Sequence, residues 1–264
     1  MEKFRFKKNL GQNFLQDEKI LQRIVESVMC TEDDCIVEIG PGHGALTKYL
    51  VKYNCPVIAF EIDKEVKPVL DRIKAPNLRV VYEDFMKVNV KEYLPDNYKN
   101  LYIIANIPYY ITTPILEKII TENLNEKSCT LMVQKEVADR FSAKPGSKDY
   151  GSISVYLDYY YQVKKLFEVP RKAFYPVPNV DSAIIKLDRK DKRDLADEDK
   201  FFKFVKSAFQ FKRKNLRNNL KNYDLEKINS ILVKYNHNLQ NRAEEISLKE
   251  FLDIYAALFS NEVQ

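Results

Sequence analysis

The chain has 264 residues, 45% of them hydrophobic, which is enough for one large domain or for a medium domain with a smaller one. Basic residues number 43 against 38 acidic ones, so the formal net charge is only +5. No apolar run approaches the roughly 20 residues that cross a bilayer, and the basic N-terminus lacks the apolar segment of a signal peptide. We expect a soluble, cytoplasmic protein.

The four cysteines and two histidines do not follow a metal-binding pattern. Cys30, Cys35, Cys55 and Cys129 lack the C-x-x-C spacing of common zinc sites, and they do not indicate a disulfide framework. We therefore expect reduced, mostly buried thiols and no bound metal.

Signals for helices and strands alternate along the first half of the chain. Asp17 is expected to cap a helix that runs to Val28. Strands are predicted at 36–39, 57–61, 78–83, 101–106 and 129–134, and helices at 45–53, 65–73 and 114–122. Such alternation predicts an α/β fold in which helices cover both faces of a parallel sheet.

Three glycines follow the first of these strands. They lie in the segment Gly40–Gly44, and a helix signal comes directly after it, so the pattern is strand, tight turn, helix. Glycines in such a turn let the backbone approach a bound molecule closely. The next strand ends in Glu61, roughly 20 residues after Gly40, where an acid can accept hydrogen bonds from both hydroxyls of an adenosine ribose.

The turn by itself fits several nucleoside cofactors. As a bare motif it matches a nicotinamide or flavin dinucleotide about as well as S-adenosylmethionine. The spacing of Gly40, Gly42 and Gly44 departs from the dinucleotide pattern G-x-G-x-x-G. In addition, Glu38 lies just inside the strand, where a carboxylate can face a cationic ligand. These two features favour S-adenosylmethionine.

Polar residues stand at or just past the ends of four predicted strands. They are Glu61, Asp84, Asn106 and Gln134. Ligands of open α/β sheets bind at the carboxyl ends of the strands, so we expect these side chains to surround one site. Asp84 is placed to bond the exocyclic amine of an adenine ring, although helix capping or loop solvation would explain it equally well.

The strongest chemical signal is the turn Asn106-Ile107-Pro108-Tyr109. Pro108 makes the turn rigid, and Tyr109 offers an aromatic face on which an extruded base can stack. The Asn106 amide oxygen and the Ile107 carbonyl can accept hydrogens from an amino group of that base. The arrangement suits an amino nucleophile, and the alternative is plain loop architecture.

One segment near the C-terminus concentrates basic charge. From Phe201 to Asn222 there are seven basic residues and no acid, so the segment carries +7 while the whole chain carries +5. Its apolar residues recur at near-helical spacing, which predicts one packed face and one cationic face. A solvated surface would explain such a run, but the absence of acids favours a polyanionic partner. The residues that we expect to bind RNA are Lys212, Arg213, Lys214 and Arg217.

Together these motifs resemble those of the S-adenosylmethionine-dependent rRNA adenine N6-dimethyltransferases. The likeness rests on Glu38–Gly44 and Asn106–Tyr109 and extends in order over the first 190 residues or so. Further matching segments are 11–15, 131–136 with Arg140, 150–152, 174–178 and 180–182, and 242–245 continues the likeness. The resemblance implies a Rossmann-like class I methyltransferase fold with a small C-terminal all-helical domain.

Two branches of this family differ in their target. The housekeeping branch, the KsgA type, dimethylates two adjacent adenines near the 3′ end of small-subunit (16S) rRNA. The Erm branch dimethylates one adenine of large-subunit (23S) rRNA and confers antibiotic resistance. Gly11, Pro114, the run 134–136 and the segment 145–151 resemble the housekeeping branch. We therefore expect a housekeeping enzyme of ribosome biogenesis, with an Erm-type enzyme as the alternative.

The resemblance also implies roles for single residues. The family's cofactor contacts fall on Asn13, Leu15, Gly40, Glu61, Asp84 and Asn106. Its contacts with the target adenine fall on Asn106, Ile107, Pro108, Tyr109 and Phe174. Tyr110 stands where relatives often carry asparagine, and it is given no role.

A charged stretch without apolar residues, 188–194, predicts the boundary between two domains. Residues 1–190 form the expected catalytic domain that binds S-adenosylmethionine, and 191–264 the expected helical domain that binds rRNA. Helices are predicted at about 199–221 and 224–235, and a last one follows Ser247, which forms a capping box with Glu250. Nothing in the sequence requires more than a monomer.

Two other classes of function stay open. One is a nucleic-acid-binding protein on the same scaffold, like the mitochondrial transcription factors related to this family, for which methylation is dispensable. The other is a small-molecule N-methyltransferase, against which the basic segment argues. Gly40, Glu61, Asp84 and Asn106 are all present, which weighs against a loss of activity.

Overall fold

The computed structural model describes residues 14–106, 108–191 and 195–259, and of Tyr109 only the backbone. The chain divides into two compact units. The described part of the first unit comprises 14–138 and 164–189, and that of the second 139–163, 190–191 and 195–259. Residues 139–163 thus group with the helices, in place of a single division after residue 190. That 1–190 and 191–264 act as separate functional domains stays a prediction.

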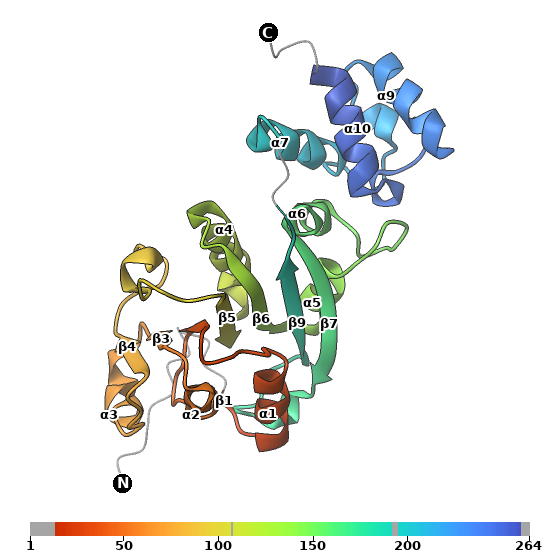
Figure 1. The fold of residues 1–264 in the computed structure, drawn as a ribbon. Coiled ribbons are helices and arrows are strands. Elements are labelled where there is room, and N and C mark those ends of the chain that lie inside the picture. Colours follow the sequence, from red (N-terminus) through yellow and green to blue (C-terminus); the bar gives the residue numbers. More distant parts are fainter. Residues whose placement is uncertain (1–13, 107, 192–194, 260–264) are drawn as a thin grey trace. The chain divides into compact units, whose positions relative to one another are not determined.

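A seven-stranded sheet forms the centre of the first unit (Figure 1). Its order is β4 (Leu78–Val81), β3 (Val57–Phe60), β2 (Cys35–Ile39), β5 (Leu101–Asn106), β6 (Glu126–Gln134), β9 (Ser182–Arg189) and β7 (Tyr161–Val169). The pairs from β4 to β6 are parallel, as predicted. However, β9 is antiparallel to β6, so the expectation of a purely parallel sheet was wrong.

The five predicted strands are confirmed, since β2 to β6 lie at the expected positions. Each of β2, β3 and β5 is buried along nearly its whole length, as parallel strands covered on both faces are. Ile36, Leu50, Ile104 and Ile184 belong to the core around them. The predicted burial of the four cysteines is also confirmed, and all four are free thiols.

The helices of the first unit are short. They are α1 (Glu18–Glu26), α2 (Thr47–Leu50), α3 (Lys67–Leu70), α4 (Thr112–Glu122) and α5 (Lys135–Phe141), the last of which runs into the second unit. One-turn helices lie at Val51–Tyr53, Lys64–Val66, Val90–Tyr93, Tyr109–Ile111 and Arg171–Ala173. Asp17 caps α1 as predicted, because its Oδ1 accepts from the Lys19 and Ile20 amides at 3.0 and 3.2 Å.

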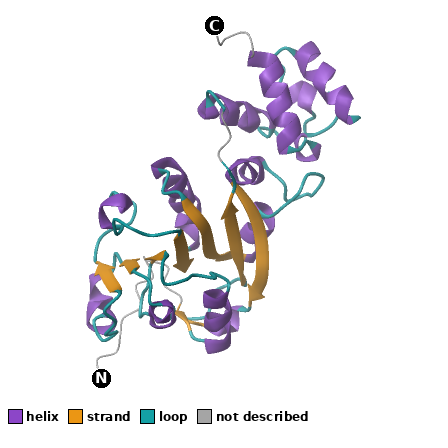
Figure 2. Cartoon of the chain, in the orientation of Figure 1, coloured by secondary structure: helices purple, strands orange, loops and turns teal. Residues whose placement is uncertain are grey.

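The second unit is helical apart from the start of β7 (Figure 2). It contains α6 (Ser152–Tyr160), α7 (Glu198–Ala208), α8 (Leu216–Asn219), α9 (Leu225–Leu232) and α10 (Leu248–Phe259), with one-turn helices at Val233–Tyr235 and Ala243–Glu245. Its core combines aliphatic side chains with aromatic ones, among them Phe201, Phe204 and Phe251. None of the helices in the described ranges is both long enough and apolar enough to span a bilayer.

The expectation of one helix over 199–221 was wrong. The helix ends at Ala208 and resumes at Leu216, and residues 209–215 form a turn. The new helix begins there because Asn215 caps it and accepts from the Asn218 amide at 3.2 Å. The apolar residues on both sides of the turn follow the helical period, so their spacing does not reveal the break in the helix.

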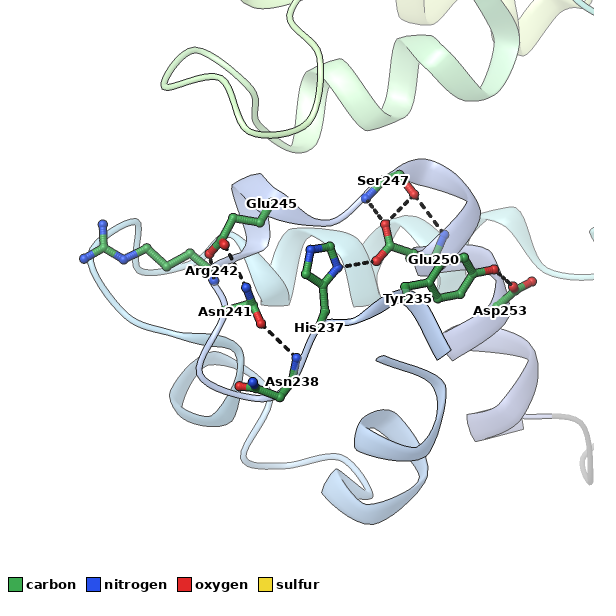
Figure 3. Close-up of polar contacts among 9 residues, drawn as sticks. All are labelled: Tyr235, His237, Asn238, Asn241, Arg242, Glu245, Ser247, Glu250 and Asp253. Atoms are coloured by element: carbon green, nitrogen blue, oxygen red, sulfur yellow. Dashed lines mark hydrogen bonds and ion pairs between the residues drawn. The ribbon is translucent and has the colours of Figure 1, made fainter. Parts of the chain in front are cut away.

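The predicted capping box at the start of α10 is confirmed. The Ser247 amide donates to Glu250 Oε2 at 2.8 Å, and the Glu250 amide donates to Ser247 Oγ at 3.3 Å (Figure 3). The other Glu250 oxygen lies 2.6 Å from Nδ1 of His237. Both ends of the segment 237–247 are thus tied to Glu250, and inside the segment Asn241 Nδ2 donates to Glu245 Oε2 at 2.7 Å.

Candidate functional site

The first unit holds a cavity of about 160 Å³ at the carboxyl ends of β2, β3 and β5. Most of the predicted site residues that the structure describes line it. These are Leu15, Gly40, Glu61, Asp84, Asn106, Pro108 and Phe174. Gln134, at the end of β6, does not line it, so the expectation that all four strand ends share one site was wrong for β6.

Three predicted residues are not placed in this cavity by the structure. Asn13 and Ile107 lie outside the described residues. The backbone of Tyr109 begins the one-turn helix Tyr109–Ile111, directly after Pro108, but its side chain is not described. Their roles stay predictions.

The glycine turn forms one wall of the cavity. Gly40, Gly42 and Gly44 have φ of 70°, 55° and 77°, in the left-handed region that favours glycine. A Cβ on Gly44 would lie 2.4 Å from Ile73 Cδ1, so a side chain there would collide with the segment after α3. The predicted tight turn is confirmed, and the close approach of its backbone to a bound molecule stays a prediction.

A short antiparallel pair, β1 (Phe14–Leu15) with β8 (Phe174–Tyr175), lies over the turn. Leu15 pairs with Phe174 in the register, and both side chains are buried. The Phe14 ring stacks on His43 with 4.2 Å between ring centroids. Two segments far apart in sequence therefore meet at this wall, and Phe14 and His43 are lining residues that we did not predict.

Glu61 is held in place by two backbone amides. Its Oε2 accepts from the Gly42 amide at 2.9 Å, and its Oε1 accepts from the Asp63 amide at 2.8 Å. The side chain is buried, and burial raises the pKa of its carboxyl. The carboxylate is thus fixed in orientation, with lone pairs left to accept further hydrogen bonds.

Glu38 is a second buried carboxyl on the wall of the cavity. Burial raises its pKa from 4.5 to about 7, and the charge of Glu61 adds to the shift. A hydrogen bond from Thr47 Oγ1 to Glu38 Oε2, 2.7 Å long, works in the opposite direction. Near neutral pH this carboxyl lies close to the midpoint of its titration, so a positive charge in the cavity would favour its ionised form.

Beside Asp84 the cavity becomes apolar. Asp84 Oδ1 accepts from the Met86 amide at 3.0 Å, which fixes the carboxylate at the rim of the cavity. Phe85 follows Asp84 in the cavity lining. Ile62, which follows Glu61, also lines the cavity and is 55% exposed although it is a large apolar residue. The sequence contained a signal for this pair that we missed, since each follows one of the acids at a strand end.

The turn after β5 supplies a further part of the wall. Asn106 is half-buried at the last position of the strand, and Pro108 follows it into the cavity lining. Tyr110, to which the sequence gave no role, also lines the cavity and is 69% exposed.

The basic residues of 201–222 belong to the second unit, and all seven have exposed side chains. Lys212, Arg213 and Lys214 lie in the turn between α7 and α8, whereas the sequence placed them on one face of a long helix. Arg217 lies in α8 itself. The Lys212 ammonium donates to the carbonyl of Lys148 at 3.0 Å.

Comparison with known proteins identifies the family. A family model described as ribosomal RNA adenine dimethylase matches residues 3–259. This chain belongs to the ribosomal RNA adenine dimethylase family. The chain is 42% identical to the ribosomal RNA small subunit methyltransferase A of Bacillus mycoides, over 98% of this chain and 94% of the relative. It is 43% identical to the protein of that name in Bacillus cereus, over 97% and 92%.

Two solved structures of methyltransferases have the same fold. A dimethyladenosine transferase from Plasmodium falciparum is 26% identical and covers 94% of this chain and 98% of its own, with a TM-score of 0.80. The 23S rRNA methyltransferase ErmE is 25% identical and covers 93% and 99%, with a TM-score of 0.77. The expected class I methyltransferase fold with a helical C-terminal region is confirmed.

Replacing Glu38 by glutamine should change how stability depends on pH. The unfolded chain ionises this carboxyl near pH 4.5 and the folded chain near pH 7, so the free energy of unfolding falls as pH rises through that window. In E38Q the fall should be smaller by about 3 kcal/mol, which urea unfolding without cofactor between about pH 5 and about pH 8 would measure. Parallel curves for the two proteins would contradict this assignment.

Proposed function

We propose that this dimethylase transfers methyl groups from S-adenosylmethionine to the N6 amino groups of two adjacent adenosines near the 3′ end of small-subunit rRNA. It would act in the cytoplasm, as a monomer, during ribosome biogenesis. One observation carries the proposal: a single cavity combines carboxylates suited to an adenosine with the Asn106 turn and Phe174, which suit a flat amino-bearing base.

The polar and apolar groups that line this cavity fit S-adenosylmethionine. Glu61, oriented by two amides, would accept hydrogen bonds from the ribose hydroxyls, and Asp84 would accept one from the adenine amine. Ile62 and Phe85 would make apolar contacts with that adenine ring. Glu38 would balance the positive charge of the ligand. When bound, the cofactor supplies an electrophilic methyl group on a sulfonium centre.

Asn106 would orient the nucleophile. The lone pair of an adenine N6 is delocalised into the ring, and hydrogen bonds that accept both N6 hydrogens favour a pyramidal nitrogen. The Asn106 amide oxygen would accept one of them and the Ile107 carbonyl the other. Pro108 would keep this turn rigid, while Tyr109 and Phe174 would hold the base between two aromatic rings. This arrangement requires no strong general base.

The choice of the small subunit is supported by sequence relatives. The two Bacillus proteins at 42% and 43% identity carry the name of a small-subunit methyltransferase, whereas ErmE is 25% identical. The two solved structures differ little in TM-score, 0.80 against 0.77, so the fold does not separate the two targets. An Erm-type activity is therefore the second candidate.

Labelled S-adenosylmethionine would test the proposal with two substrates in parallel, unmodified small ribosomal subunits and protein-free large-subunit rRNA. We expect N6,N6-dimethyladenosine in the small subunit alone. Label confined to large-subunit rRNA would indicate the Erm-type activity instead. Binding of rRNA without transfer to either substrate would favour the nucleic-acid-binding alternative.

Replacing Asn106 by alanine should reduce methyl transfer by at least roughly 100-fold, the usual cost of one preorganised polar contact at a reacting group. Binding of rRNA should persist, because the basic residues lie in the other unit. The matched control is Asn97→Ala, which removes an exposed amide outside the cavity and should leave transfer unchanged. Near-normal turnover by N106A would rule out the proposed role.

Replacing Arg213, Lys214 and Arg217 together by alanine should weaken binding of rRNA and flatten its salt dependence. Three lost phosphate contacts reduce the slope of log K against log salt by about 2. The control triple variant removes Lys227, Lys234 and Lys249, which are exposed in other helices of the same unit. An equal change of slope in both variants would mean that 201–222 has no special part in binding.

A further inference from the structure

The turn between α7 and α8 exposes an aromatic ring among cations. Phe211 is 57% exposed, and it is the one phenylalanine with an exposed side chain in the ranges that the structure describes. Its neighbour Phe209 packs against the core of the helical unit, with 5.9 Å between its ring and that of Phe251. More than half of the Phe211 side chain thus meets solvent, which presents an aromatic face to a ligand.

The buried side chain of Asn219 fixes the backbone of this turn by hydrogen bonds. The side chain is only 9% exposed, and its Nδ2 lies 2.7 Å from the carbonyl of Ala208 and 3.3 Å from that of Phe211. Its Oδ1 accepts from the Phe211 amide at 3.2 Å. The Lys214 amide closes the turn with a 2.9 Å hydrogen bond to the carbonyl of Phe211. The backbone that carries Phe211 is therefore held on both sides of the ring.

The end of the turn is also tied to the segment 237–247, part of which Figure 3 draws. The Leu216 and Arg217 amides donate to the carbonyls of Asn241 and Leu239 at 2.9 and 3.0 Å. At the other side, Lys212 Nζ bonds the carbonyl of Lys148. Binding a ligand at this turn thus has little backbone entropy left to lose, which is the condition for a preorganised contact.

The charge around Phe211 selects the kind of ligand. Lys212, Arg213 and Lys214 follow it directly, all three are exposed, and no acid occurs between 201 and 222. An aromatic face beside several cations fits a chain that alternates phosphates with flat unpaired bases. An apolar peptide could pack on the ring but would leave the cations without partners. An acidic peptide could pair with the cations but would not cover the ring.

We propose that Phe211 is a stacking platform for an unpaired nucleobase of rRNA, with Arg213 and Lys214 on the phosphates that flank this base. The proposal rests on the proposed function, because it takes rRNA as the partner. The basic residues of this surface recognise only the charge of the phosphates. Stacking on Phe211 adds a contact that only an unpaired base can make. Stacking, unlike phosphate contact, does not depend on released counterions.

The chain contains no tryptophan, so a single Phe211→Trp substitution gives a fluorescent reporter at the ring. Single-stranded RNA should quench this fluorescence, and an RNA duplex of the same length should quench it far less. The matched control is Val233→Trp, at a 59% exposed position of the same unit, which should not be quenched at equal saturation. Bound RNA with no quenching in F211W would overturn the proposal.

A second variant separates stacking from charge. Phe211→Ala should weaken binding of single-stranded RNA by roughly 5- to 100-fold, the range for one stacked base, while the salt slope stays that of the unchanged chain. Phe211→Tyr should restore the affinity. Unchanged affinity in F211A would contradict the proposal. Methyl transfer by the unchanged chain tests the proposed function separately, since failure there would leave the quenching result intact.

Discussion

The 2.9 Å hydrogen bond from the Gly42 amide to Glu61 joins the turn after β2 to the end of β3, and the cavity is built around it. Gly42 forms it from a left-handed backbone, a conformation that favours glycine. It also fixes one oxygen of Glu61, while the Asp63 amide fixes the other. Parallel pairing of β2 and β3 brings the two partners together, so fold, turn and carboxylate depend on one another.

Two carboxyls are buried in one cavity, and a positive charge placed there would stabilise their ionised forms. Glu38 and Glu61 both have raised pKa values, chiefly because burial penalises the ionised form. Without a ligand this penalty lowers the stability of the folded chain near neutral pH. A cation in the cavity would relieve it, so binding and protonation are linked. The same electrostatics that weakens the free protein favours a sulfonium ligand over its neutral product.

Much of this site was readable from the sequence because strand ends of a parallel sheet converge at one edge. That rule predicted Glu61, Asp84 and Asn106, whereas Gly40 was predicted from the glycine turn that follows the first strand. Gln134 follows the same pattern and yet lies elsewhere, since the rule gives the edge and not the extent of the cavity. The apolar partners Ile62 and Phe85 were missed for a related reason: their role depends on which acid precedes them, not on hydrophobic periodicity.

The break between α7 and α8 shows what periodicity cannot report. Asn219 binds backbone groups eight to eleven residues earlier in the chain, so a turn replaces a helix without any change in apolar spacing. The difference matters for function. A helix would spread its cations over one long face, whereas this turn collects three of them and an aromatic ring in four consecutive residues on a fixed backbone. Charge gathered in this way attracts RNA in general, and the ring beside it favours the places where a base is unpaired.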